Sequence, residues 1–148
     1  VGRTHERGPP TSAMAGPVTT ATLTWTHDLQ FDARSGQTAL TIDSKGAAGP
    51  SPVEALALAL AGCMAIDVVD IVTKGRHPLE GLTAALRAER AADPPRRFVA
   101  VSLHFVLRGA VPGPAVERAL QLSRDKYCSV WQTLRQDIPL STTFEVVP

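Results

Sequence analysis

Apolar and polar residues alternate along the first third of the chain with the period of two that is typical of β-strands. Residues 18–27 (VTTATLTWTH) show this alternation and are rich in threonine, and residues 29–33 continue it after a short turn. A second turn at residues 34–36 leads to a third segment of this kind, residues 38–43. The pattern predicts a three-stranded antiparallel meander.

The next part of the chain carries the signals of a long helix. Ser51 can cap the helix, Pro52 suits its first position, and Glu54 completes a capping box three residues after the cap. Gly75 is a natural stop, so we expect the helix to run from about residue 52 to residue 74. Its apolar residues occur nearly all round the helix axis, which predicts that other elements enclose it.

The second half of the chain is expected to hold three strands and two helices. The strands are predicted at residues 82–90, 98–108 and 141–147, and the helices at 113–126 and 130–136. Grouped strands without alternating βαβ units predict an α+β fold, with an antiparallel sheet and a long buried central helix packed on it. Alternate apolar side chains of the middle strand share one face: Val99, Val101, Leu103, Phe105 and Leu107.

The composition is that of an ordinary folded domain. The chain has 148 residues, of which 44% are hydrophobic and 20% charged, and we expect residues 17–148 to form one domain. Its 15 basic and 14 acidic side chains leave no excess positive charge for a phosphate backbone, so no nucleic-acid partner is expected. The longest uncharged apolar run, residues 55–66, spans about 18 Å as a helix, which is too short for a bilayer core. No membrane partner is expected either.

The N-terminal segment and the cysteine content indicate the cellular compartment. Residues 1–16 contain no apolar stretch, so no signal peptide is expected; we expect a leader that is disordered, poorly packed or foreign to the native protein, with Met14 as a plausible native start. The chain has two cysteines, too few for the disulfide framework of a small secreted protein. These features predict a cytoplasmic protein, in which such a pair serves either core packing or redox chemistry.

Cys63 lies midway along the predicted apolar helix. A cysteine in this setting ordinarily packs as a small hydrophobic residue. Its neighbour Gly62 changes the balance, because a glycine inside a helix costs about 1 kcal/mol relative to alanine and often permits the close approach of another backbone. Packing and chemistry both remain open for Cys63.

Cys128 follows a predicted helix end, where a side chain is easier to reach than inside a helix. Lys126 lies beside it and Arg124 is four residues back on the same helical face. Nearby cations favour the thiolate, which is the nucleophilic form of cysteine, although Asp125 partly offsets them. Packing and chemistry are open for this cysteine as well.

A metal site is not expected. Two cysteines are too few ligands by themselves. Asp67 and Asp70 are interpreted as a polar edge on the second half of the helix. No ligand spacing relates the four histidines, His5, His27, His77 and His104.

Two blocks around the cysteines carry a family resemblance. One is Ser51-Pro52-x-Glu54, followed by an alanine-rich helix and the run 61–69 (AGCMAIDVV); the other extends from residue 117 to residue 130 and contains KYCSV. Together they resemble the OsmC/organic hydroperoxide resistance family over residues 18–147, as a divergent OsmC-like branch. The resemblance implies an OsmC-like fold and an intertwined homodimer, with each central helix packed on its partner and the active sites at the dimer interface.

The resemblance also implies a reaction. Cys63 would be the peroxidatic residue, whose thiolate attacks the O–O bond of an organic hydroperoxide and becomes a sulfenic acid. Cys128 would resolve it into a disulfide, which a dithiol such as a dihydrolipoyl protein reduces by exchange. The resemblance implies no metal, flavin or other cofactor.

The chain departs from the family pattern at the residues that activate the thiol. In the best-defined hydroperoxide reductases a glutamate directly follows the proline and pairs with an arginine from the first hairpin. Val53 holds that position in this chain. Glu54 is nine residues before Cys63, about 180° round the helix and therefore on the opposite face. Arg34 lies several residues beyond the expected arginine position.

Glu54, Arg34 and Arg124 therefore remain candidate supporting residues rather than an evident ion pair. Arg34 reaching across a dimer interface is one source of the cation that would lower the pKa of Cys63. Two alternatives to the peroxidase stay open. One is a stress-response protein on the same scaffold whose cysteines sense redox state or line an apolar pocket. The other is a structural domain whose cysteines lie far apart.

Overall fold

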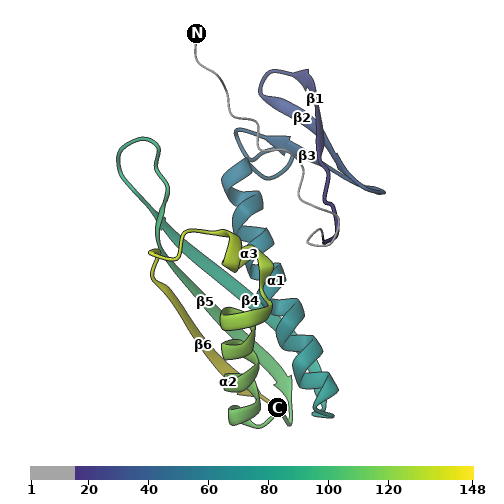
Figure 1. Ribbon diagram of the computed structural model, residues 1–148, viewed down its shortest axis with the longest axis vertical. Coiled ribbons are helices and arrows are strands. Elements are labelled where there is room, and N and C mark those ends of the chain that lie inside the picture. Colours follow the sequence, from purple (N-terminus) through teal and green to yellow (C-terminus); the bar gives the residue numbers. More distant parts are fainter. Residues whose placement is uncertain (1–15) are drawn as a thin grey trace. The chain divides into compact units, whose positions relative to one another are not determined.

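A computed structural model describes residues 16–148 of the chain, which form two compact units, one up to Ser51 and one from Pro52 onward (Figure 1). The predicted leader therefore lies outside the described residues, except for Gly16. That residues 17–148 form a single domain stays a prediction.

The first unit is the meander that the alternation predicts. Strands β1 (Thr22–His27), β2 (Gln30–Ser35) and β3 (Thr38–Asp43) form an antiparallel sheet in the order β1-β2-β3. Tight turns join neighbouring strands, which fixes the antiparallel direction. The three-stranded antiparallel prediction is confirmed.

The second unit is a helical layer on one face of a three-stranded sheet (Figure 1). The sheet has the order β4-β5-β6; helix α1 packs on β4, and helix α2 contacts both α1 and β6. A single π-helical turn, η1, continues directly from α2 and is followed by the short helix α3. The bounds are α1 Pro52–Lys74, β4 Leu79–Arg90, β5 Phe98–Gly109, α2 Gly113–Leu122, η1 Ser123–Tyr127, α3 Ser129–Thr133 and β6 Leu140–Val147.

The last strand corrects the expected sheet direction. Strands β4 and β5 pair antiparallel, but β6 runs parallel to β5, with Val101 opposite Leu140. The helices between β5 and β6 carry the chain back to the starting end of β5, and such a crossover connection produces parallel strands. The predictions of a wholly antiparallel sheet and of no βαβ unit are therefore wrong for β6.

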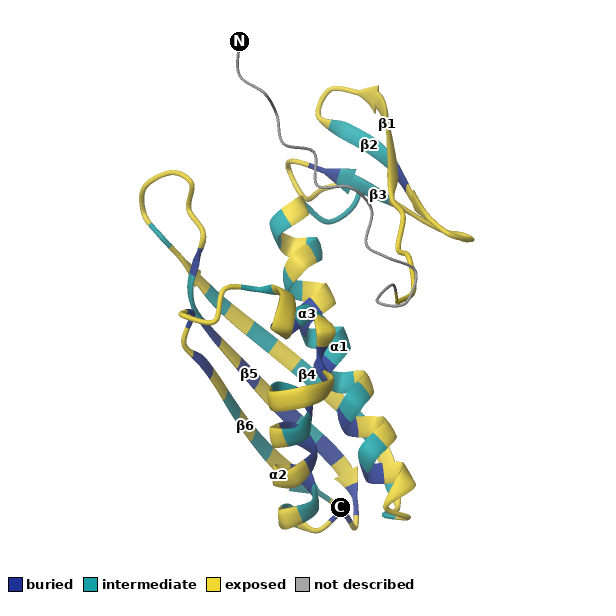
Figure 2. Cartoon of the chain, in the orientation of Figure 1, coloured by how far each residue is buried: buried dark blue, intermediate teal, exposed yellow. Residues whose placement is uncertain are grey.

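The core of the second unit lies between α1, α2 and the sheet. The apolar face predicted for β5 is confirmed, because Val101, Leu103, Phe105 and Leu107 are buried, while Val99 is half-buried. On α1 the buried residues recur every four positions and form one stripe along the helix: Leu60, Met64, Val68 and Val72. Buried and exposed segments accordingly alternate along α1 (Figure 2).

Only this stripe of α1 is fully buried, and the opposite face of the helix is exposed. Leu58 is 64% exposed and Ile66 is 70% exposed, and Val69 is also exposed. The expectation of a fully enclosed helix is therefore not met by the second unit alone. By length and composition α1 could also span a membrane, which is weak evidence because core helices of soluble proteins share these features.

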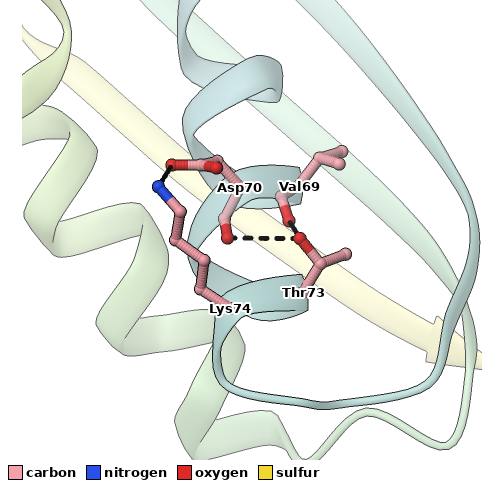
Figure 3. A network of polar contacts seen from close by, with 4 residues as sticks. All are labelled: Val69, Asp70, Thr73 and Lys74. Carbon is pink, nitrogen blue, oxygen red and sulfur yellow. Dashed lines mark hydrogen bonds and ion pairs between the residues drawn. The ribbon is translucent and has the colours of Figure 1, made fainter.

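Local contacts fasten the C-terminal end of α1 (Figure 3). Lys74 Nζ donates to Asp70 Oδ2 at 2.8 Å, and Thr73 Oγ1 donates to the Val69 carbonyl at 2.7 Å. The Gly75 amide donates to the Ile71 carbonyl at 3.0 Å, and the helix ends there as predicted. Asp70 is thus an exposed residue engaged with its own helix, as the polar-edge interpretation expects.

Candidate active site

Cys63 lies near the middle of α1, beside the buried stripe. It is half-buried, and the next residue, Met64, is fully buried against the core. A Cβ added at Gly62 would meet nothing within 4 Å, so the close backbone approach expected at this glycine is wrong within the described chain. The helix therefore presents the Cys63 sulfur at the boundary between core and solvent.

Cys128 caps the N-terminus of α3 directly after the π-helical turn. The Trp131 amide donates to Cys128 Sγ at 3.3 Å, and the Cys128 amide donates to the Ser123 carbonyl at 2.8 Å. The residue has no exposed surface. The expectation that Cys128 is the easier cysteine to reach is wrong, because the turn directs its side chain into the core.

The fold brings the two sulfurs together although they are 65 positions apart in the sequence. Each sulfur lies within 4.8 Å of the other and of a carboxylate oxygen of Asp67. Both cysteines are free thiols. The alternative in which the cysteines are remote and only structural is therefore wrong.

Burial lowers the acidity of the Cys128 thiol, which is the inner of the two. The pKa of Cys128 lies at about 12 instead of the ordinary 9.0, chiefly because burial deprives the thiolate of hydration. The Trp131 amide acts in the opposite direction, whereas the interaction with Cys63 and the Asp67 carboxylate contribute to the increase. The predicted cationic lowering of the Cys128 pKa is therefore wrong.

Asp67 is the site residue that sequence reasoning missed. It is half-buried, and its Oδ2 accepts a hydrogen bond of 2.7 Å from the buried Ser123 hydroxyl. The polar-edge interpretation thus holds for Asp70 but not for Asp67. The sequence spacing could have pointed to Asp67. It is four residues after Cys63, and residues four apart on a helix share one face.

Arg124, one of the three predicted supporting residues, belongs to η1 and points elsewhere. Its guanidinium donates to the Leu140 carbonyl. It also lines a cavity of about 730 Å³ whose lining residues include neither cysteine. The other nearby cation, Lys126, lies over the Tyr127 ring, 5.2 Å from its centroid.

The other two predicted supporting residues, Glu54 and Arg34, lie on α1 and β2. Glu54 is in the first turn of α1, and nine residues of helix separate it from Cys63 by roughly 13 Å along the axis. Arg34 is on β2 in the first unit and pairs with Asp32 at 3.4 Å. Supporting roles for Glu54, Arg34 and Arg124 stay predictions.

Comparison with known proteins identifies the family. A model of the OsmC-like protein family matches residues 43–143, which include both cysteines. The chain belongs to the OsmC-like family. Protein YhfA of Escherichia coli strain K12 is 38% identical over 130 residues, which cover 86% of this chain and 97% of YhfA.

Solved structures confirm the OsmC-like fold. A hypothetical protein from Aquifex aeolicus is 26% identical with a TM-score of 0.83, and the match covers 89% of this chain and 98% of that one. An organic hydroperoxide resistance protein OsmC from Legionella pneumophila has a TM-score of 0.67 at 16% identity, over 89% and 99% of the two chains. At that identity the similarity to the Legionella protein concerns the fold alone.

Alkylation should distinguish the two thiols of this OsmC-like protein. At pH 8 we expect iodoacetamide to modify Cys63 well before Cys128, because the reagent needs an accessible thiolate and Cys128 is buried with a raised pKa. Peptide mapping of a time course measures the order, and the same labelling in denaturant is the control, where both should react alike. Faster labelling of Cys128 in the folded protein would contradict the assignment.

The raised pKa of Cys128 also determines how the stability of the folded protein changes with pH. Between pH 9 and 12 the folded state keeps the Cys128 proton that the unfolded chain loses, so this group's contribution to stability falls across that window.

Proposed function

We propose that this OsmC-like protein is a thiol-dependent peroxidase that reduces organic hydroperoxides, with Cys63 as peroxidatic and Cys128 as resolving residue. The observation that carries the proposal is the paired site itself, with one half-buried and one fully buried free thiol whose sulfurs lie within 4.8 Å. Family membership supports the substrate class, because some structural relatives are named organic hydroperoxide resistance proteins.

The reaction has three balanced steps. The Cys63 thiol attacks the O–O bond of ROOH, which gives the Cys63 sulfenic acid and the alcohol ROH. The Cys128 thiol then displaces the sulfenic hydroxyl, which leaves as water as the disulfide forms. A dithiol exchanges with this disulfide, restores both thiols and is itself oxidised.

The different environments of the two sulfurs assign these roles. A hydroperoxide must reach the attacking sulfur, and Cys63 is the cysteine with exposed surface. Cys128 is buried, and its raised pKa keeps it protonated until an oxidised Cys63 lies beside it. A disulfide needs an S–S distance of about 2.05 Å, so the two sulfurs must move closer by side-chain rotation.

We also propose a cytoplasmic homodimer in which a second copy covers the exposed apolar face of α1. The exposed side chains of Leu58, Ile66 and Val69 support this, because a monomer would leave them in water. The reductant would be a dithiol such as a dihydrolipoyl protein. Light scattering at several protein concentrations tests the dimer, and a monomer throughout would refute it.

Mass spectrometry tests the proposed chemistry directly. One equivalent of cumene hydroperoxide added to the reduced protein should lower the mass by about two hydrogen atoms, because a Cys63–Cys128 disulfide forms. Peptide mapping then locates the linkage. Unmodified thiols after this treatment would contradict the proposal.

A second candidate function is redox sensing without turnover. The Asp67 carboxylate favours it, because its negative charge helps to keep the pKa of Cys128 high, which opposes the attack of that thiol in the resolving step that turnover needs. The two functions differ when a dithiol is in excess. A peroxidase consumes many equivalents of hydroperoxide under these conditions, whereas a sensor consumes about one.

A further inference from the structure

We propose that the reduced protein binds a thiophilic divalent cation, Zn²⁺, through Cys63, Asp67 and Cys128. This inference goes beyond the peroxidase activity and does not depend on it. It revises the expectation of no metal site, which counted only the two cysteines. The structure adds Asp67 as a third ligand.

The donor atoms are close to the spacing that zinc requires. The two sulfurs and one Asp67 carboxylate oxygen all lie within 4.8 Å of one another. Around a tetrahedral zinc, with Zn–S of about 2.3 Å and Zn–O of about 2.1 Å, neighbouring ligand atoms are roughly 3.5–3.8 Å apart. The donors therefore need to close by at most about 1.3 Å, which side-chain rotation can provide.

The backbone holds these donors in an arrangement common to metal sites. Cys63 and Asp67 are four residues apart on α1 and share a helical face, as do the paired ligands of helical zinc motifs. Cys128 comes from the start of α3, which packs against α1. Two elements thus contribute ligands from both sides of the site.

Contacts beyond the ligands restrict two of the three donors. The Ser123 hydroxyl donates to Asp67 Oδ2 at 2.7 Å, and the Trp131 amide donates to Cys128 Sγ at 3.3 Å. Hydrogen bonds of this kind orient metal ligands and strengthen binding. They leave lone pairs on the carboxylate and the sulfur to face a cation.

A dication would compensate the charge that the donors acquire on binding. Zinc binding removes the protons of both thiols, and the two thiolates and the carboxylate would together carry a charge of about −3. Such a cluster at the edge of the core is costly unless a cation lies among the donors. Sulfur donors select zinc over the hard cations magnesium and calcium.

The half-buried position of Cys63 places the fourth coordination position on the accessible side. Three protein ligands plus water is the arrangement of open zinc sites. Oxidation of Cys63 and Cys128 to a disulfide would remove two of the three ligands. Metal binding is therefore a property of the reduced protein only.

Cobalt provides a spectroscopic test. Co²⁺ added to the reduced full-length chain without oxygen should give near-ultraviolet thiolate-to-cobalt charge-transfer absorption that saturates at one equivalent and disappears when Zn²⁺ displaces it. Cys63→Ser and Cys128→Ser should each lose part of this absorption. Absence of charge-transfer absorption at millimolar Co²⁺ would overturn the proposal.

Asp67→Asn supplies the sharper comparison. It should weaken Co²⁺ binding by at least about 10-fold, since a neutral amide replaces a charged ligand while it can still accept from Ser123. Asp70→Asn is the matched control on the same helix, where the carboxylate is exposed and pairs with Lys74; it should bind like the parent. Equal affinity of the Asp67 and Asp70 variants would overturn the proposal. No peroxide is present, so failure would leave the peroxidase hypothesis untouched.

Discussion

Cys63→Ser should reduce the turnover of an alkyl hydroperoxide with a dithiol reductant by at least about 10³-fold, because it removes the attacking nucleophile. A serine hydroxyl does not ionise at neutral pH and forms no stable adduct equivalent to a sulfenic acid. The site is otherwise little altered, since oxygen is smaller than sulfur and Cys63 is only half-buried. A coupled assay of dithiol consumption measures the loss.

Cys128→Ser is the matched control for this prediction. It retains Cys63, so the first oxidation should proceed, and the Cys63 sulfenic acid should accumulate because no second thiol lies within 4.8 Å to resolve it. A sulfenic-acid trap followed by mass spectrometry would detect the adduct. Undiminished turnover in Cys63→Ser would refute the proposed mechanism, and an adduct on Cys128 instead would reverse the roles.

Leu60→Ala should lower the free energy of unfolding by about 2–5 kcal/mol, the usual range for a fully buried leucine. Leu60 has no exposed surface and belongs to the stripe by which α1 packs on the rest of the second unit. The change leaves a cavity one helical turn before Cys63, so some loss of thiol pairing should accompany it. Urea unfolding followed by circular dichroism measures the effect.

Leu58→Ala is the matched comparison, with the same substitution two residues away on the same helix. Leu58 is 64% exposed within the chain, so its loss should cost less than that of Leu60. If a second copy covers this face, the cost should grow with protein concentration, because association stabilises the folded state by mass action. Equal losses of unfolding free energy in Leu58→Ala and Leu60→Ala at every protein concentration would contradict the burial pattern of α1.

The boundaries of α1 could be predicted because short-range chemistry sets them. Ser51, Pro52 and Gly75 mark its ends in the sequence, and the helix spans Pro52–Lys74. The buried face of β5 was equally predictable, since alternation with period two is a local property of the sequence. By contrast, β4 begins at Leu79, three residues before the predicted start, where a proline and two glycines weaken the pattern.

The direction of β6 could not be predicted by the same means. A parallel and an antiparallel strand of this length show the same alternation, and only the path of the preceding helices decides between them. The extent of burial on α1 was also undetermined. An apolar surface in the sequence does not say whether the same chain or another copy covers it.

The thiol pair was recognised through family resemblance, whereas its surroundings depended on the structure. The sequence predicts a surface carboxylate at Asp67. In the structure η1, which continues from α2, places the Ser123 hydroxyl against it. The cations that flank Cys128 in the sequence turn elsewhere, Arg124 to a backbone carbonyl and Lys126 to an aromatic ring. The sequence neighbours of Cys128 therefore gave the wrong prediction for both its accessibility and its acidity.

The sequence by itself determined the kinds of element, their order and the ends of α1, because each depends on residues within a few positions of one another. Tertiary structure alone decided that the sulfurs meet beside a carboxylate, that the inner thiol is the more buried, and that the last strand runs parallel. These properties arise from contacts between residues dozens of positions apart, and loss of water on burial then sets the acidity of the inner thiol.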